Sequence, residues 1–212
     1  VQINSSIGVL DTYDNLKLAS DSVLPHVRTD IVQYLKQSKD FSIERLQFNR
    51  FAGLGKETYA KFSVGLLEEM FGGIGGEILY RPFYKSYAIG AEAWFVKQRD
   101  YSMQFDFREY ETVTGHLTFY YRNEPTKILF MLRGGKFLAK DSGLNFDISR
   151  VFDNGLRMGV FFSRTDISKE EFGEGSFDKG WYFHIPLESF FRVYRKGSTS
   201  FGLRPVTRDG AQ

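Results

Sequence analysis

The sequence predicts an all-β, antiparallel fold of about ten strands, and three consecutive segments near its C-terminal end carry this prediction. Over residues 144–149, and again over 156–163, apolar and polar residues alternate with the two-residue period of a strand. The residues Asp153-Asn154-Gly155 between them are typical of a hairpin turn. A third alternating segment covers residues 181–187. Each segment has one wholly apolar face, so we expect a sheet with one apolar face and one polar face.

The first forty residues differ from the rest of the chain. We divide the sequence into an N-terminal segment, residues 1–40, and an antiparallel β-barrel domain, residues 41–212. Residues 11–19 have the composition of a short strand. Residues 22–37 predict one amphipathic helix, since apolar residues recur there at four-residue steps after a possible N-cap at Asp21 or Ser22. The apolar positions are Val23, Val27, Ile31 and Leu35.

The remaining chain reads as short strands separated by turn residues. Before the three segments already described, we expect strands over residues 41–51, 58–68, 76–84, 86–96, 102–109, 113–122 and 127–138. The turn signals between them lie at residues 72–76, 97–100, 123–125 and 141–143. The tail after residue 196 is polar and weakly patterned, so no strand is predicted there.

The composition removes several classes of function. The 28 basic and 26 acidic residues are scattered and leave a net charge of only +2, which is unlike a nucleic-acid-binding surface. The chain has no cysteine, which excludes disulfides, thiolate metal sites and thiol catalysis. No stretch approaches the roughly 20 apolar residues of a membrane helix. The aromatic share of 17%, with 22 Phe and 12 Tyr, favours the aromatic girdles of outer-membrane barrels.

Alternation by itself does not say which face of the sheet is outside. In a soluble, lipocalin-like barrel or in a sandwich, the apolar face would be the core and the polar face would meet water. In an outer-membrane barrel it would meet lipid, and the polar face would line the lumen. In that second case the candidate lumen-facing, glycan-contact residues are Lys61, Arg81, Glu92, Asp106, Arg108, His116, Arg122, Asp147, Arg157 and His184. Charges of both signs on that face are too costly to bury as a core, so it is either an exterior surface or a lumen.

Catalytic and metal-binding patterns are weak. The three histidines, His26, His116 and His184, are widely separated and suggest no metal site. A catalytic triad of Ser176, Asp178 and His184 can be drawn, but no nucleophile-elbow sequence accompanies it. We therefore expect no enzyme activity, no metal and no cofactor. An envelope hydrolase acting on glycan or lipid is the alternative function.

A polar, glycine-bearing run at residues 173–180 precedes the third alternating segment. We expect a structured loop at the barrel's end, in which Gly173, Gly175 and Gly180 permit tight backbone angles and Ser176 or Asp178 bonds nearby amides. The same prediction includes polar contacts between Asp178 and Lys179. The alternative is that this loop contacts the glycan or a partner protein.

Several long strings resemble those of the YjbH/GfcD family of outer-membrane exopolysaccharide and capsule biosynthesis proteins. The strings cover residues 66–83, 98–100, 114–116 and 173–180, and the similarity extends from about residue 26 to the end. Members of this family are longer lipoproteins, and the chain resembles their C-terminal portion.

The resemblance implies an outer-membrane-type β-barrel or barrel segment in a Gram-negative bacterium, with the apolar face toward lipid. It also implies a non-enzymatic role in exopolysaccharide or capsule secretion. The expected partners are outer-membrane lipid, the polymer and other secretion-machinery proteins, with no nucleic acid. About ten strands would close a barrel too narrow for a polymer, so export would need further strands from elsewhere.

Overall fold

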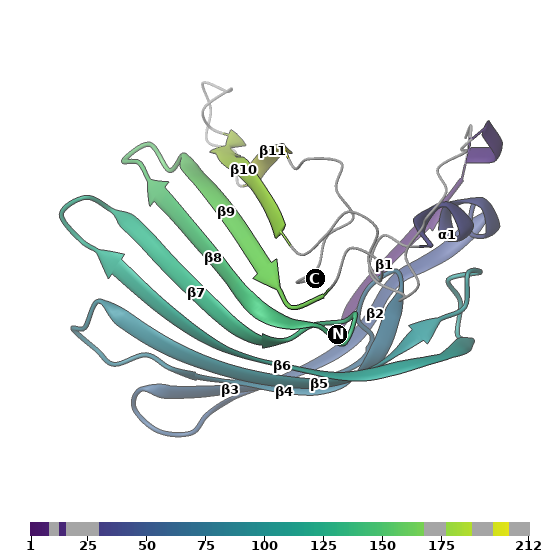
Figure 1. The fold of residues 1–212 in the computed structure, drawn as a ribbon, viewed down its shortest axis with the longest axis horizontal. Helices are drawn as coiled ribbons and strands as arrows, with labels where there is room; N and C mark the ends of the chain where they lie inside the picture. The colour runs from purple at the N-terminus through teal and green to yellow at the C-terminus, as the bar shows by residue number, and fades with distance from the viewer. Residues whose placement is uncertain (9–12, 16–29, 168–176, 188–196, 204–212) are drawn as a thin grey trace.

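The computed structural model describes residues 1–8, 13–15, 30–167, 177–187 and 197–203, and the structural statements below concern these residues. They form one antiparallel sheet of eleven strands in which every strand pairs with its neighbours in the sequence. The sheet bends into a trough (Figure 1). The strands are β1 (Gln2–Ile7), β2 (Phe41–Gly53), β3 (Thr58–Leu66), β4 (Phe71–Tyr80), β5 (Tyr87–Arg99), β6 (Phe107–Asn123), β7 (Ile128–Lys136), β8 (Ser142–Val151), β9 (Arg157–Thr165), β10 (Phe177–Pro186) and β11 (Ser198–Leu203).

The all-β, antiparallel prediction is confirmed, whereas closure into a barrel is not. Among the described residues, β1 and β11 are the two edges of the sheet and do not pair with each other. Strand β11 lies in the tail for which no strand was predicted, and it pairs with β10 from Trp181 to Pro186. The N-terminal segment also joins the sheet, since β1 pairs with β2.

The helical content is small. Helix α1 (Ile31–Gln37) lies inside the predicted helix 22–37, and residues 22–29 lie outside the described residues. The short strand predicted over 11–19 is not seen in its described part, because Tyr13–Asn15 form the 3₁₀ turn η1. The N-terminal strand is instead β1, which finds a partner in β2. No helix in the described part of the chain is long and apolar enough to span a bilayer.

The glycine-rich run at residues 72–76 was predicted as a turn, and this prediction is wrong because the run lies inside β4. The role of its glycines is to let neighbouring groups approach the strand closely. A Cβ atom at Gly73 would lie 2.1 Å from the carbonyl oxygen of Phe95, and one at Gly75 would lie 2.3 Å from the Trp94 ring. Glycine is therefore required here by packing rather than by a change of chain direction.

Two further boundaries differ from the prediction. Residues 97–99 belong to β5 rather than to a turn, because the strand continues until Arg99 enters a buried site described below. Strand β6 joins residues 107–109 of the first predicted strand to the predicted strand 113–122, while residues 102–106 form the loop before it. Residues 110–112, between the two predicted strands, also belong to β6. One of them is fixed by a hydrogen bond, since the Tyr110 hydroxyl donates to the Leu138 carbonyl at 2.6 Å.

The two faces of the sheet differ sharply in chemistry. Large apolar side chains stand exposed on the convex face, for example Phe62, Ile78, Leu117 and Val160. The concave face carries polar residues, of which Ser63, Ser149 and Ser163 are almost fully buried. Because successive strand residues point to opposite faces, the alternation in the sequence becomes this division.

The apolar core lies at one end of the trough rather than under the sheet. Its buried residues come from α1, from the β3–β4 turn and its flanks, and from the end of β5 and the loop after it. We call this region the capped end. Its buried core consists of Tyr34, Met70, Phe71, Val96 and Met103.

Candidate functional site: the polar inner wall of the trough

A row of ionisable side chains crosses four neighbouring strands on the concave face. Lys61 of β3 is paired in register with Glu77 of β4, Glu77 with Glu92 of β5, and Glu92 with His116 of β6. The Lys61 ammonium lies 2.8 Å from the Glu77 carboxylate, and His116 Nδ1 lies 2.9 Å from Glu92 Oε1. We call these four residues the first cluster. Its charges are compensated by one another rather than by the backbone.

Trp94 lies beside the first cluster because the facing strand carries a glycine. The Trp94 ring lies against Gly75, where any side chain would collide with it. The indole Nε1 donates to Glu92 Oε2 at 3.2 Å, and the Lys61 ammonium lies 5.5 Å from the ring centroid. A half-buried aromatic ring among hydrogen-bonding groups can stack on the apolar face of a sugar while those groups bind its hydroxyls.

A second cluster repeats this arrangement on β8, β9 and β10. The Tyr182 ring lies across Gly159, where a Cβ atom would be 2.4 Å from the ring. Its hydroxyl donates to Asp147 Oδ1 at 3.0 Å. Arg157 Nε donates to Ser149 Oγ at 3.1 Å, and its guanidinium lies 5.7 Å from the Tyr182 ring centroid. An aromatic ring, a cation and a carboxylate are thus placed together a second time.

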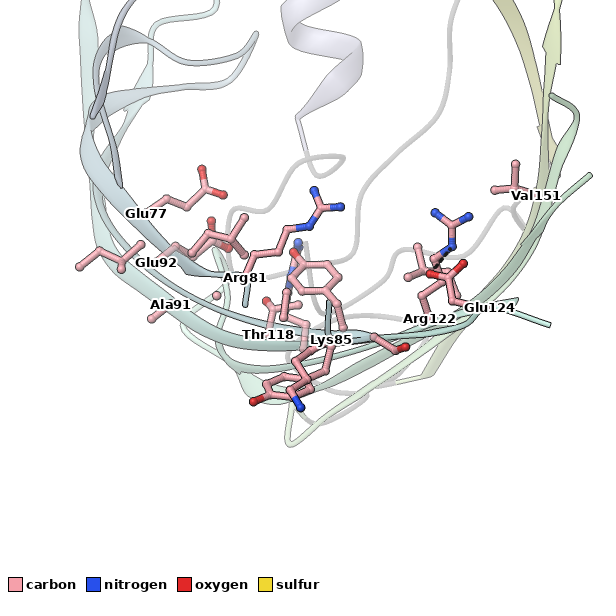
Figure 2. A pocket seen from close by; sticks show the side chains of 18 of the residues that line it. Glu77, Arg81, Lys85, Ala91, Glu92, Thr118, Arg122, Glu124 and Val151 are labelled. Atoms are coloured by element: carbon pink, nitrogen blue, oxygen red, sulfur yellow. Dashed lines mark ion pairs between the residues drawn. The ribbon is translucent and has the colours of Figure 1, made fainter. Parts of the chain in front are cut away.

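Between the clusters and the turns opposite the capped end lies a cavity of about 370 Å³. It is lined by residues of β4 to β8 and the turns that connect them. Glu77, Glu92, Arg81 and Arg122 point into the concavity of the sheet (Figure 2). The volume falls within the ~300–1,000 Å³ range of small-ligand sites.

Most of the predicted lumen-facing residues do share the concave face. Those in register or lining the cavity are Lys61, Arg81, Glu92, His116, Arg122, Asp147, Arg157 and His184. His184 Nδ1 lies 2.6 Å from Ser200 Oγ of β11. Whether these residues contact a glycan stays a prediction.

Asp106 and Arg108 are placed elsewhere. Asp106 is exposed in the loop before β6, and its carbonyl accepts a hydrogen bond from the Asp100 amide. Arg108 lies 4.0 Å from Asp100 and 4.1 Å from the centroid of the Tyr101 ring. Both residues belong to the capped end, because the strand predicted over 102–109 does not begin until Phe107.

The predicted loop at 173–180 is only partly described. Gly173, Gly175 and Ser176 lie outside the described residues. Asp178 and Lys179 lie in strand β10, so their predicted placement in a loop is wrong. Consecutive strand residues face opposite ways: Asp178 is buried opposite Ser163, and the Lys179 ammonium lies 5.6 Å from the Phe177 ring centroid.

The proposed triad is not assembled either, since Ser176 lies outside the described residues and Asp178 and His184 stand six residues apart on one strand. At about 3.3 Å per residue, that spacing separates them by roughly 20 Å. Among the described residues, no group of three or more His, Asp or Glu side chains could hold a metal ion.

Sequence reasoning missed Arg99, the largest fully buried side chain among the described residues. Its guanidinium donates to six backbone carbonyl oxygens at 2.6 to 3.4 Å. Tyr34 of α1 donates its hydroxyl to the Arg99 carbonyl at 2.6 Å, and burial raises the pKa of Tyr34, which keeps this donor protonated. The only signal was the string Gln98-Arg99-Asp100. The accepting carbonyls belong to Ile43, Glu44, Glu68, Glu69, Met103 and Gln104.

Glu68 lies beside this buried cation. Burial, and then the charge of Glu69, raise the pKa of Glu68 to about 7, while Arg45 and Arg99 act in the opposite direction. Its Oε1 is buried and has no hydrogen-bond partner among the described residues. The capped end therefore contains a carboxyl group that changes charge near neutral pH.

Comparison with known proteins identifies the family. The model of the YjbH family, described as exopolysaccharide biosynthesis protein YbjH, matches residues 1–212. The chain belongs to this family. It is 39% identical over 206 residues to the "Uncharacterized lipoprotein YjbH" of Escherichia coli (strain K12). That alignment covers 95% of the chain and 29% of the relative, so the chain spans less than a third of the relative's length. No solved structure matches the chain.

Proposed function

We propose that the chain forms part of the wall of an outer-membrane β-barrel that takes part in exopolysaccharide or capsule secretion without catalysing a reaction. The observation that carries this proposal is the division of one sheet into an exposed apolar convex face and a polar concave face. The convex face would contact lipid and the concave face would contact the polymer. Membership of an exopolysaccharide biosynthesis family supports the assignment of the polymer.

The convex face is difficult to reconcile with contact with water. Its exposed side chains include Phe48, Phe62, Ile74, Phe95, Val113, Leu117, Phe119 and Leu132, which come from adjacent strands. A contiguous apolar surface of this kind marks a contact with protein or membrane. A lipocalin-like barrel would place such residues inside, whereas the inside of this sheet is polar. An envelope location also fits the name of the E. coli relative, a lipoprotein.

The two edge strands of the sheet are where further strands would pair to close a barrel. Eleven strands leave β1 and β11 unpaired with each other in the described residues, and the E. coli relative is much longer than the chain. In the proposal, the remainder of such a protein or a partner supplies the strands that enlarge the barrel enough for a polymer to pass.

Arginine substitutions at two equally exposed apolar positions test the membrane contact. Val160 is 52% exposed on the convex face, and Phe83 is 56% exposed in the β4–β5 turn beyond the strands. If lipid covers the convex face, Val160→Arg destabilises the assembled protein by about 2–4 kcal/mol, since a charge then enters the bilayer. Phe83→Arg should change the free energy of unfolding by less than about 0.5 kcal/mol.

The measurement is the unfolding of the full chain in lipid vesicles. The heat-dependent shift of the folded band in gels monitors the unfolding. Equal, small effects of Val160→Arg and Phe83→Arg would show that water covers the convex face and would contradict the proposal. Folding of the wild type into a monodisperse monomer without detergent or lipid would contradict it as well.

A further inference from the structure

The cavity of the inner wall carries an imbalance of charge that the proposed function leaves unexplained. Its acidic side chains already have partners: Glu77 pairs with Lys61 at 2.8 Å, Glu92 with His116 at 2.9 Å, and Glu124 with Arg122 at 3.3 Å. Each carboxylate among the described lining residues therefore already has a side-chain partner, a cation for Glu77 and Glu124 and the His116 ring for Glu92.

Three cations that line the same cavity lack such partners. Arg81 follows β4, Lys85 lies in the β4–β5 turn, and Arg133 lies on β7. Within the described ranges, none of their side chains makes an ion pair or a hydrogen bond with another residue. The Arg81 guanidinium projects into the concavity (Figure 2). The described lining thus has five basic side chains against three carboxylates, and three of those basic side chains are unpaired: the basic residues are Arg81, Lys85, Arg122, Lys127 and Arg133.

Arg133 shows the deficit most clearly. It is half-buried, and its Nε is enclosed without an acceptor in the described part of the chain. Its neighbours in register, Thr118 and Asn145, are neutral. The nearby charge of Glu92 acts on Arg133 electrostatically, but that carboxylate is already hydrogen-bonded to His116 and Trp94. A partly buried cation without a bonded acceptor is destabilised, and an anion entering the cavity would relieve this cost.

The wall beside these cations can accept a sugar ring. The Tyr120 ring lies along the sheet against Gly90, with a closest approach of 3.7 Å to the position of a Cβ atom there. Tyr120 and Thr118 both line the cavity. A flat aromatic surface next to a cation suits a sugar that carries a negatively charged substituent.

We propose that this cavity is a binding subsite for an anionic sugar of the polysaccharide, with Arg81, Lys85 and Arg133 as its counter-charges. The ligand chemistry is a carboxylate, phosphate or sulfate group on a sugar ring. This inference rests on the proposed function and names the class of polymer that the inner wall recognises: an acidic polysaccharide rather than a neutral one.

The test measures the binding of three soluble polymers of matched length to the full chain in uncharged detergent micelles. The probes are polygalacturonate, which carries carboxylates, dextran sulfate, which carries sulfates, and neutral dextran. The variants are Arg81→Gln, Lys85→Gln and Arg133→Gln. Arg164→Gln, which removes an exposed cation of the convex face on β9, is the matched control. Titration calorimetry gives the affinities, and circular dichroism reports whether each variant is folded.

We expect at least one acidic polymer to bind more tightly than dextran. Arg81→Gln and Arg133→Gln should each weaken that binding about tenfold, because a charge-assisted hydrogen bond is lost, while Arg164→Gln leaves it unchanged. Arg81 and Lys85 make no described side-chain contacts that their substitution would break, so they test the inference even if Arg133→Gln fails to fold. A preference between polygalacturonate and dextran sulfate identifies the anionic group.

Three results would overturn the inference. Equal binding of dextran and the acidic polymers would leave glycan contact standing but remove the anionic subsite. An equal loss in Arg164→Gln would mean that acidic polymers bind only through the total charge of the protein. Failure of folded wild-type protein to bind any of the three polymers would count against the subsite and against the proposed glycan contact together.

Discussion

The capped end holds a charged side chain that is fully buried, the inner wall holds charged side chains that are partly exposed, and the two regions compensate these charges in different ways. At the capped end, Arg99 is fully buried and all its described acceptors are backbone carbonyls. On the inner wall, Lys61 binds the Glu77 side chain, and Arg157 binds the Ser149 side chain and lies near Asp147. Basic side chains thus donate to backbone carbonyls at the capped end and to other side chains on the inner wall.

This difference separates a structural role from a functional one. The carbonyls that accept from Arg99 belong to β2, the β3–β4 turn and the β5–β6 loop, so the guanidinium ties together segments that are distant in sequence. Backbone partners cannot rotate away to bind a ligand. Side-chain partners on the inner wall can exchange one another for the hydroxyls of a passing glycan at little cost, because each such hydrogen bond has a net value of only about 1 kcal/mol.

Replacement of Arg99 and of Arg157 is expected to show the largest difference in stability between the two regions. Arg99→Met leaves several buried carbonyls without a donor, and we expect it to destabilise the protein by roughly 3–5 kcal/mol or to prevent folding. Arg157→Met on the inner wall should cost about 1 kcal/mol. Chemical unfolding in detergent measures both. Similar losses for the two variants would contradict the division into structural and exchangeable charge.

The stability of the capped end should also depend on pH, because of Glu68. Its pKa of about 7 in the folded protein lies above the ordinary value of 4.5, so the folded state holds a proton that the unfolded state has lost between these values. Stability from this group is therefore present below pH 4.5 and falls as the pH rises to about 7, by up to about 3 kcal/mol.

Glu68→Gln removes this titration and should flatten the pH dependence of unfolding between pH 4.5 and 7, relative to the wild type. Glu111→Gln, which removes an exposed carboxylate on β6, is the control and should keep the wild-type profile. An unchanged profile in Glu68→Gln would mean that the Glu68 carboxyl is solvated in the folded protein.

A smaller effect is expected from the glycine under Trp94. Gly75→Ala places a methyl group 2.3 Å from the ring, so the indole must move and its bond to Glu92 is lost; we expect a cost of about 1–3 kcal/mol. Gly53→Ala is the control, since no atom lies within 4 Å of its Cβ position. Trp94 fluorescence in a Trp181→Phe background reports the displacement, and an unshifted spectrum in Gly75→Ala would show that the ring is not held there.

The features that the sequence predicted correctly depend on residues that are neighbours along the chain. The two-residue period placed Leu144, Met158 and Val160 on one face and Asp147 and Arg157 on the other, and the sheet follows that division. Side-chain direction in a strand is a local property of the backbone, so it is readable without knowledge of the partner strand. The all-β class and the shared polar face of most candidate residues follow from it.

Contacts between distant residues required the tertiary structure. The row from Lys61 to His116 depends on the register of four strands, which no local pattern specifies. The glycine-rich run at residues 72–76 looks like a turn in the sequence, and only the rings and carbonyls packed against its glycines explain why it lies in a strand. Arg99 reads as one more polar residue near a turn until segments far apart in the chain bring their carbonyls to it. The two faces of the sheet were therefore predictable from local pattern, whereas the pairing of the charges depends on contacts between segments that are far apart in the chain.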